Sequence, residues 1–316
     1  MRVAFDARGA RDTRGIGRYV RSLREALEAI AVGDRELVET HRPRRVDVFH
    51  SPWIDGALLR PPCAMVVTLH DLVPLKRRGE YLRTGVRFKM RYLAVRRAAR
   101  LLVPTEAVAG DAVEHLGFPR ERIDVVPYAA SSALRAAPEP RVAEVRARYG
   151  IPERYLLWVG GLETPDPRKR VAALAATPRE LPLVLVGRHG SWAGELPDVH
   201  LTGHVPDEDL AAIYTGAHAL VFPSDDEGFG LPPVEALACG TPVVATEVPA
   251  VREVLGDRAR FVESGDMAGL VAAAEAATRP APAPPAWTWG DVAAATWETY
   301  ERAAGWQGPA APRHAR

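Results

Sequence analysis

Short apolar runs alternate with longer amphipathic stretches along most of the chain. Each apolar run has the length of a buried strand, and the runs are Val3–Phe5, Val46–Phe49, Met65–Leu69, Leu101–Pro104, Ile123–Val126, Tyr155–Val159, Leu183–Val186, Val199–Thr202, Ala219–Phe222 and Pro242–Ala245. Between the first two runs, apolar residues from Tyr19 to Ile30 recur at helical spacing. Short buried strands that alternate with helices predict parallel β/α units.

The alternation restarts near residue 150, which indicates two domains. A helical segment at Arg141–Tyr149 ends at Gly150-Ile151-Pro152, a typical helix stop signal. We therefore predict one doubly wound domain over residues 1–148 and a second over residues 149–284. Only about 16 residues separate the first helix from the strand at Val46, so we expect a strand–helix unit to be missing from the first domain.

The end of the chain has a different pattern. Pro280–Pro285 reads PAPAPP, which suits a stiff connector and neither a helix nor a central strand. A final amphipathic helix is predicted from about Asp291 to Ala304, with Trp297 and Tyr300 on one face, within a segment spanning residues 285–306. Residues 307–316 are predicted to be a disordered tail.

The composition is that of a globular protein. The length of 316 residues suits two average domains, and 47% hydrophobic with 26% charged residues excludes wholesale disorder. No run of 18 apolar residues occurs, and the N-terminus is charged where a signal peptide is apolar, so we expect a cytoplasmic protein. Cys63 and Cys239 lie too far apart to indicate a disulfide framework or a metal knuckle. Residues 1–150 hold 28 basic and 18 acidic side chains, against 13 and 22 in residues 151–316, which suggests domains with different partners.

The loop after the strand Ala219–Phe222 carries the most chemistry. It reads PSDDEGFG and leads into a helix at Pro232-Pro233. Its glycines allow the backbone to approach a ligand, and the N–H groups at the start of the helix suit a diphosphate. Glu227 lies in the loop, and we place Glu235 in the first turn of the helix. The alternative for Glu227 alone is a solvated loop acid, and the alternative for Glu235 alone is an acid that complements the helix dipole.

Glu227 and Glu235, within PSDDEGFGLPPVEALACGTPVVA, resemble the E-x7-E segment of retaining, GT-B-fold glycosyltransferases of family 4, in their mannosyltransferase-like branch. Further segments that resemble this family, in the same order, are TRGIGRY from Thr13, DVFHSP from Asp47, TLHDLVP from Thr68, VVPY from Val125, WVGG from Trp158, PRKR from Pro167 and GHVPDEDL from Gly203. The resemblance implies an α/β fold of the GT-B type. It has two Rossmann-like doubly wound domains facing each other across a cleft, with the C-terminal helix crossing back to the N-terminal domain.

The resemblance also implies a donor site in the second domain, for a nucleotide sugar. Glu235 would accept hydrogen bonds from the ribose hydroxyls, Glu227 would lie beside the transferred sugar, and Lys169 would stabilise the diphosphate. Further donor-binding residues implied in this way are Gly15, Gly17, Gly161, Arg168, Lys169, His204, Val205, Glu227, Gly228, Phe229, Gly230, Leu231 and Glu235. Gly161 occupies a position where the family usually has an arginine, and Arg168 is our candidate to replace it.

His70, at the end of a strand, would contact the transferred sugar or the acceptor, so the catalytic candidates are His70, Glu227 and Lys169. A structural role is the alternative for His70. Asp225 and Asp226 do not form a metal site in this interpretation, because no third ligand lies at a suitable spacing, and we expect them to be solvated loop acids. No cofactor and no metal is predicted for the chemistry.

The helical stretch at about Leu82–Arg100, with the residues just before it, forms a basic segment. Lys76–Arg100 carries ten basic residues and one acid, with apolar residues between them. It suits an acceptor or membrane face that binds anionic lipid headgroups, or else a solvated helix surface. The residues we assign to this face are Arg77, Arg78, Arg83, Arg87, Lys89 and Arg91. No nucleic-acid-binding module is recognisable, so nucleic acid is not an expected partner.

The sequence therefore predicts a retaining hexosyltransferase that acts on a glycan, a lipid-linked or a small-molecule acceptor. GDP-mannose is the first expectation for the donor and a UDP-sugar the second. The protein would be cytoplasmic, with attachment to the inner face of the plasma membrane as an alternative. A non-catalytic nucleotide-sugar-binding protein of the same fold stays open as an alternative function. A nicotinamide-dependent oxidoreductase is disfavoured, because Gly15 and Gly17 are not followed by the third glycine of a dinucleotide fingerprint.

Overall fold

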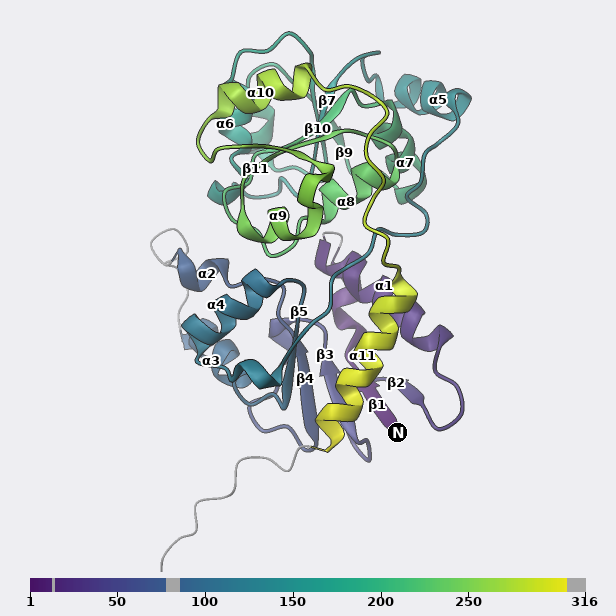
Figure 1. The fold of residues 1–316 in the computed structure, drawn as a ribbon, viewed down its shortest axis with the longest axis vertical. Helices are drawn as coiled ribbons and strands as arrows, with labels where there is room; N and C mark the ends of the chain where they lie inside the picture. Colours follow the sequence, from purple (N-terminus) through teal and green to yellow (C-terminus); the bar gives the residue numbers. More distant parts are fainter. Residues whose placement is uncertain (13–14, 78–85, 306–316) are drawn as a thin grey trace, which may run out of the picture. The chain divides into compact units, whose positions relative to one another are not determined.

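The computed structural model describes residues 1–12, 15–77 and 86–305. The chain divides into two compact units (Figure 1). The N-terminal unit consists of Met1–Pro127 and the segment from Trp289 onward, and the C-terminal unit consists of Tyr128–Thr288. The last helix, α11 (Trp289–Ala304), therefore returns to the first unit, as the family resemblance implied.

A six-stranded parallel sheet forms the centre of the N-terminal unit, with the strand order β2-β1-β3-β4-β5-β6. Its strands are β1 (Arg2–Phe5), β2 (Glu36–Glu39), β3 (Val48–Ser51), β4 (Ala64–Thr68), β5 (Arg100–Val103) and β6 (Ile123–Val125). Its helices are α1 (Gly15–Ala29), α2 (Val73–Lys76), α3 (Val86–Val95), α4 (Glu106–Leu116) and α11, with 3-10 turns η1 (Ala7–Arg11), η2 (Ile54–Gly56) and η3 (Arg120–Arg122). Strands β2 and β3 flank β1 on opposite sides, so the winding of the sheet reverses between β1 and β3.

The C-terminal unit repeats this plan with the strand order β12-β11-β10-β7-β8-β9, again all parallel. Its strands are β7 (Leu156–Val159), β8 (Leu183–Val186), β9 (Val199–Gly203), β10 (Ala219–Phe222), β11 (Val243–Thr246) and β12 (Arg260–Val262). Its helices are α5 (Glu139–Tyr149), α6 (Val171–Ala176), α7 (Asp207–Gly216), α8 (Leu231–Ala238), α9 (Pro249–Leu255) and α10 (Met267–Glu275), with 3-10 turns η4 (Pro167–Lys169), η5 (Ser191–Glu195) and η6 (Gly256–Arg258). Here the winding reverses between β7 and β10.

The predicted doubly wound units are confirmed, but several details of the prediction were wrong. The strand expected to be missing is present as β2, which the alternation did not reveal because this edge strand reads Glu-Leu-Val-Glu and is only half-buried. No helix follows β2 within residues 30–47, all of which are described. Strand β12 was also missed, and Gly15 and Gly17 lie in the first turn of α1 and not in a loop. The predicted helix at 82–100 ends at Val95, and its first residues lie outside the described part of the chain.

The boundary between the units lies at Pro127/Tyr128 and not at residue 148. The reason is that α5 packs on α7 of the C-terminal unit. Arg141 and Arg148 of α5 both form ion pairs with Asp209 of α7, whose carboxylate is almost fully buried. The second boundary lies at Thr288/Trp289, and residues 280–285 form neither helix nor strand, as predicted. The predicted tail at 307–316 lies outside the described residues.

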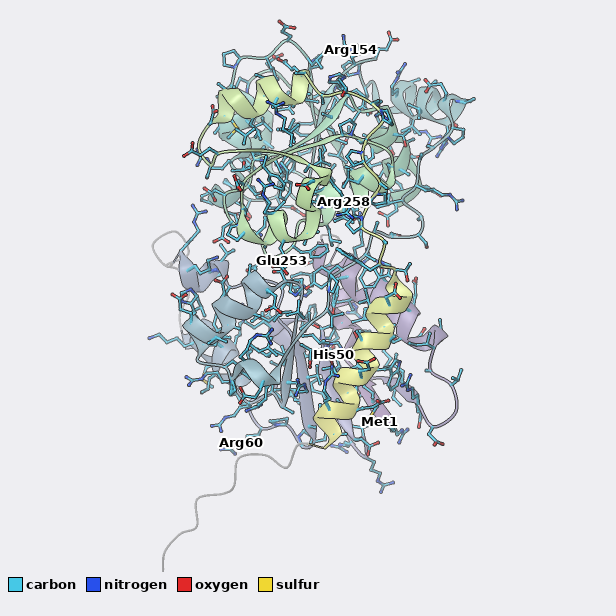
Figure 2. The ribbon with its side chains drawn as sticks, in the orientation of Figure 1. Met1, His50, Arg60, Arg154, Glu253 and Arg258 are labelled. Carbon is cyan, nitrogen blue, oxygen red and sulfur yellow. The ribbon has the colours of Figure 1, made fainter. Side chains whose placement is uncertain are left out.

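A buried chain of polar side chains attaches α11 to the N-terminal sheet. The Tyr19 hydroxyl on α1 lies 3.1 Å from Thr68 Oγ1 on β4, which lies 2.9 Å from His50 Nε2 on β3. The other ring nitrogen of His50 lies 2.6 Å from the Tyr300 hydroxyl on α11. Figure 2 shows His50 at this position beside the helix. Burial lowers the pKa of His50 to about 3, so the ring is neutral near pH 7 and both its nitrogens depend on these partners.

Removing the hydroxyl of Tyr300 should therefore destabilise the protein while preserving its shape. In Tyr300→Phe, His50 Nδ1 loses its partner in a fully buried position, which costs about 1–3 kcal/mol of unfolding free energy. Urea denaturation of the whole chain measures this loss. Glu298→Gln, at an exposed position of the same helix, is the control and should change the free energy by no more than about 0.5 kcal/mol. Equal stability of Tyr300→Phe and the control would contradict the role given to the polar chain.

Candidate functional site

The site in the C-terminal unit lies where the winding of its sheet reverses. In open α/β sheets, ligands bind at the carboxyl ends of the strands that flank such a reversal, because the adjacent loops lead away in opposite directions and leave a crevice. The two loops concerned follow β7 and β10. The first contains Gly161, Arg168 and Lys169. The second contains Glu227, Gly228, Phe229 and Gly230, so the fold brings seven of the predicted donor-site residues to one edge of one sheet.

Ion pairs connect these two loops directly. Arg168 Nη1 on η4 lies 3.1 Å from Glu227 Oε2, and Arg168 Nε lies 3.0 Å from Asp166 Oδ2. The backbone N–H of Asp225 donates to the carbonyl of Arg168 at 2.9 Å, and Arg170 Nη1 lies 3.4 Å from the Asp225 carboxylate. The arrangement holds the glutamate of the β10 loop against the cation of the β7 loop.

Asp225 and Asp226 of the β10 loop take part in the contacts between the two loops, whereas we expected them to be solvated. The Asp226 side chain is buried, and its backbone carbonyl lies 3.4 Å from Arg168 Nη1. Asp225 is engaged by Arg170 and keeps only 15% of its side chain exposed. Their sequence context of small and acidic residues suggested a surface loop, and the arginines that bury them lie more than 50 positions earlier.

Lys169 lies on the same 3-10 turn and faces an aromatic ring. Its Nζ is 5.8 Å from the centre of the Trp158 ring, at a distance suited to a cation–π interaction. Trp158 is buried on β7, and a side chain at Gly160 would come within 3.0 Å of its ring. The glycine of the WVGG segment therefore makes room for the indole on which the lysine rests.

The start of α8 has the backbone geometry that the motif predicted. Gly230 adopts φ +90° directly before the helix, a conformation that favours glycine, and Pro232 fits the first turn because it needs no N–H donor there. Phe229 is buried with its ring 4.9 Å from that of Tyr128. Gly228 follows the ion-paired Glu227 in the loop, and Leu231 is the first residue of the helix.

Glu235 lies deeper than predicted. It is in the second turn of α8 and not the first, and its side chain has no exposed surface. The Tyr214 hydroxyl on α7 donates to Glu235 Oε2 at 2.9 Å. The burial of this region and the nearby carboxylate raise the pKa of Cys239 to about 12. A ligand can reach Glu235 only after neighbouring side chains move. Tyr214 was not predicted, because a tyrosine in a helix near a strand resembles any core residue.

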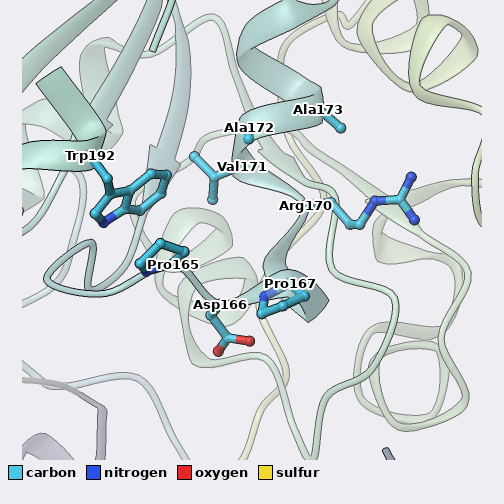
Figure 3. Close-up of a pocket in the computed structure, with 8 residues that line it drawn as sticks. All are labelled: Pro165, Asp166, Pro167, Arg170, Val171, Ala172, Ala173 and Trp192. Atoms are coloured by element: carbon cyan, nitrogen blue, oxygen red, sulfur yellow. The ribbon is translucent and has the colours of Figure 1, made fainter. Parts of the chain in front are cut away.

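A pocket of about 270 Å³ lies next to the ion-paired loops (Figure 3). It is lined by Pro165, Asp166, Pro167, Arg170, Val171, Ala172, Ala173 and Trp192. Asp166 and Arg170 belong to both the pocket and the ion-pair network, whereas none of the predicted donor-site residues lines it. The pair His204 and Val205 follows β9 in the same unit, where His204 is exposed and Val205 is buried.

His70 lies at the carboxyl edge of the N-terminal sheet, directly after β4. Its Nε2–H donates to the carbonyl of Pro52 at 2.9 Å, which leaves Nδ1 as the acceptor nitrogen of the neutral ring. Its ring makes an edge contact with Tyr19, with the ring centres 4.9 Å apart. Burial lowers the pKa of His70 despite this hydrogen bond and the nearby Asp71. Gly17 is required by packing, since a side chain there would collide with the carbonyl of Asp12.

The structure describes only part of the predicted basic face. Lys89 and Arg91 are exposed on α3, and Arg91 forms an ion pair with Asp55 of η2 at 2.5 Å. Arg77 is half-buried at the end of α2. Arg78 and Arg83 lie outside the described residues, as does the side chain of Arg87. Among the described residues, no helix is long and apolar enough to cross a membrane.

The two parallel, doubly wound sheets define a two-domain GT-B fold, with loop residues gathered where the winding of each sheet reverses. The comparisons with known proteins agree with this fold. Residues 6–130 match the model of Glycosyltransferase Family 4, and residues 153–279 match that of glycosyl transferases group 1. HepE of Anabaena, solved with UDP-glucose, superimposes with a TM-score of 0.67 at 16% identity, covering 96% of this chain and 95% of that one. The chain belongs to the family 4 glycosyltransferases.

Curated relatives include mannosyltransferases and D-inositol 3-phosphate glycosyltransferases. O-antigen chain mannosyltransferase B of Escherichia coli is 28% identical over 66% of this chain and 59% of its own length. The D-inositol 3-phosphate glycosyltransferase of Mycolicibacterium gilvum is 32% identical over 88% of this chain and 65% of its own length. The chain thus spans about three-fifths of these relatives, and only 27% of the Escherichia coli mannosyltransferase WbdA.

The Arg168–Glu227 ion pair should contribute more to the free energy of unfolding than an exposed ion pair does. Their side chains are 17% and 15% exposed, so a double-mutant cycle with Arg168→Gln and Glu227→Gln should give a coupling free energy of about 1–2 kcal/mol by urea denaturation. The control cycle uses Arg24 and Glu39, a pair at 3.0 Å that is 32% and 58% exposed, and should give less than about 1 kcal/mol. Coupling in the Arg168 cycle no larger than in the control would show that the contact does not hold the two loops together.

Proposed function

We propose that this protein is a retaining glycosyltransferase that moves a hexose from a nucleotide sugar to an acceptor hydroxyl. The observation that carries the proposal is the pairing of the β7 and β10 loops at the reversal of the C-terminal sheet, with Arg168, Lys169 and Glu227 gathered there. Family membership supports it. GDP-mannose is the first candidate donor, because mannosyltransferases are among the relatives, and a UDP-sugar is the second.

Each residue has a role that its chemistry permits. Lys169, with Arg168 in place of an arginine at Gly161, stabilises the negative charge that grows on the leaving diphosphate. Glu235 accepts hydrogen bonds from the ribose hydroxyls once the neighbouring side chains have moved. The backbone of residues 228–231, with Gly230 at φ +90°, approaches the sugar and the diphosphate. His70 contacts the transferred sugar or the acceptor.

The reaction we propose needs no covalent intermediate with the protein. The bond between the anomeric carbon and the diphosphate oxygen breaks, and the electron pair leaves with the diphosphate. The acceptor oxygen attacks from the same face, and its proton passes to the departing phosphate oxygen. Retention of configuration follows from this geometry. Exclusion of water from the site favours transfer over hydrolysis.

A binding and turnover experiment tests the donor site. The purified protein is titrated with GDP-mannose, UDP-glucose, ADP-glucose and dTDP-glucose, and with NADH as a negative control, by calorimetry and thermal shift. One nucleotide sugar should stabilise the protein, because a ligand of the folded state raises its melting temperature. Glu235→Gln should weaken that binding at least 10-fold, and Lys169→Ala should lower kcat about 10²-fold or more with a smaller effect on binding.

Arg154→Gln is the matched control, because Arg154 is an exposed cation of the same unit outside these loops (Figure 2). It should bind and turn over like the wild type. Wild-type behaviour of both site variants would overturn the site. Selective binding without hydrolysis or transfer to any acceptor would favour the non-catalytic nucleotide-sugar-binding protein instead.

We further propose that α3 attaches the protein to an anionic membrane surface. This helix exposes Met90 and Leu93, at 41% and 42%, beside Lys89 and Arg91, and Arg96 and Arg97 follow it as exposed cations. Apolar side chains among cations suit the boundary between headgroups and acyl chains. A face of this kind brings the enzyme to a lipid-linked acceptor.

Vesicle sedimentation tests this attachment. The protein should bind vesicles that contain phosphatidylglycerol and not vesicles of phosphatidylcholine alone, and added salt should weaken the binding. Met90→Ser with Leu93→Ser should reduce binding about 5-fold or more. Lys89→Gln with Arg96→Gln and Arg97→Gln should reduce it about 10²-fold, at roughly 1 kcal/mol per basic residue. Val32→Ser removes an apolar side chain that is exposed elsewhere and should have no effect. Equal binding to both kinds of vesicle would contradict the proposal.

A further inference from the structure

The N-terminal sheet has its own reversal of winding, between β1 and β3, and no motif singled out the Asp6 and Arg8 found there. Asp6 and Arg8 follow β1, whereas Ser51 ends β3 and Trp53 and Gly56 follow it. The loops that contain these residues lead away from the sheet on opposite sides. The same argument that places a ligand between β7 and β10 therefore places one here.

A buried carboxylate fixes an exposed guanidinium at this position. Asp6 has no exposed surface, and its two oxygens accept from Arg8 Nε at 2.9 Å and Arg8 Nη2 at 2.7 Å. Asp6 also accepts from the backbone N–H of Arg8 and so caps η1. The Arg8 side chain nevertheless stays 47% exposed. This geometry points the remaining edge of the guanidinium away from Asp6.

The remaining edge of Arg8 is suited to an oxyanion. A guanidinium has five N–H donors in one plane, and Asp6 uses one on Nε and one on Nη2. The other donors, on Nη1 and Nη2, form the fork that matches two oxygens of a phosphate. Because Asp6 already fixes the orientation of the side chain, little rotamer entropy is lost when an anion binds.

The surroundings of Asp6 are close-packed, and one further buried donor lies among them. A side chain at Gly56 would come within 3.0 Å of Asp6 Oδ2, Ser51 Oγ and Trp53 Nε1, so only glycine fits there. Gly9 similarly packs against the ring of Trp53. The Trp53 Nε1–H is buried and has no hydrogen-bond partner among the residues that the structure describes. Such a donor is stabilised when a ligand or an ordered water accepts from it.

We propose that Arg8, oriented by Asp6, binds a phosphate group of the acceptor. This inference rests on the proposed function, in which the N-terminal unit binds the acceptor, and it gives the acceptor a chemical class. The phosphate belongs either to a soluble phosphorylated sugar or polyol, or to the headgroup of a lipid. Arg8 is the binding residue and Asp6 is a positioning residue.

Pairs of probes that differ only in a phosphate test the site without any donor. Glucose 6-phosphate is compared with glucose, and myo-inositol 1-phosphate with myo-inositol, by calorimetry on the whole chain. Vesicles with and without phosphatidylinositol represent the lipid source, and they are measured in the variant with Lys89→Gln, Arg96→Gln and Arg97→Gln, in which attraction of α3 to anionic lipid is weakened. At least one phosphorylated probe should bind 10-fold or more tightly than its neutral partner. If the phosphorylated soluble probes bind more tightly than their neutral partners, the acceptor is soluble. If only the vesicles with phosphatidylinositol bind more tightly, the acceptor phosphate belongs to a lipid headgroup.

Variants of Arg8 identify the residue responsible. Arg8→Gln should abolish the preference for phosphate, and Arg8→Lys, which keeps the charge but loses the fork, should restore only part of it. Asp6→Asn should weaken phosphate binding several-fold while Arg8 remains present, and its thermal unfolding shows whether it is folded. Arg11→Gln, at an exposed cation of the same 3-10 turn, is the control and should bind like the wild type.

Two outcomes overturn the inference. They are equal binding of every phosphorylated probe and its neutral partner, and a preference that survives in Arg8→Gln. Failure of the proposed function looks different. In that case no nucleotide sugar binds the wild type, whereas the phosphate preference and its loss in Arg8→Gln are still measured. Conversely, Arg8→Gln should bind the nucleotide sugar as the wild type does, because Arg8 is not part of the donor loops.

Discussion

Parallel strands all end at the same edge of their sheet, and the functional chemistry of this protein depends on that constraint. The apolar strands carry almost no chemistry themselves. Where the winding reverses, two loops from distant parts of the sequence meet, and the C-terminal unit places Arg168 of one loop 3.1 Å from Glu227 of the other. The contact neutralises two partly buried charges that would each be costly alone. The same topology in the N-terminal unit places Asp6 and Arg8 near the residues that follow β3. One folding rule thus gathers two clusters of polar side chains of different composition.

The two units also keep buried polar groups in place by different means. In the C-terminal unit, ions pair across the loops, and Tyr214 fixes the buried carboxylate of Glu235. In the N-terminal unit, the aromatic and hydroxyl groups from Tyr19 to Tyr300 form a neutral chain through His50. A neutral chain avoids the cost of burying a charge, and the lowered pKa of His50 follows from the same burial. His70 contacts one end of this chain through the ring of Tyr19.

The strands and the motif loops could be predicted from the sequence because buried parallel strands read as uninterrupted apolar runs. Strand β2 could not, since it lies at an edge and has only two apolar residues, between two glutamates. The position of α5 depends on ion pairs with Asp209, about 60 positions later, which no local pattern reveals. The roles of Tyr214 and Asp6 were missed for the same reason. Their partners are set by the tertiary fold, whereas a motif records only neighbours in the sequence.

The return of α11 to the N-terminal unit has a consequence for synthesis of the protein. The groove that α11 fills beside α1 and strands β3 to β5 stays open until the last helix has left the ribosome. By then the whole C-terminal unit, residues 128–288, has already emerged as one continuous segment and can fold alone. The second unit can therefore be complete before the first, although it comes later in the sequence. Until then, His50 and the apolar residues around it lack their cover, and the nascent N-terminal unit exposes a surface prone to aggregation.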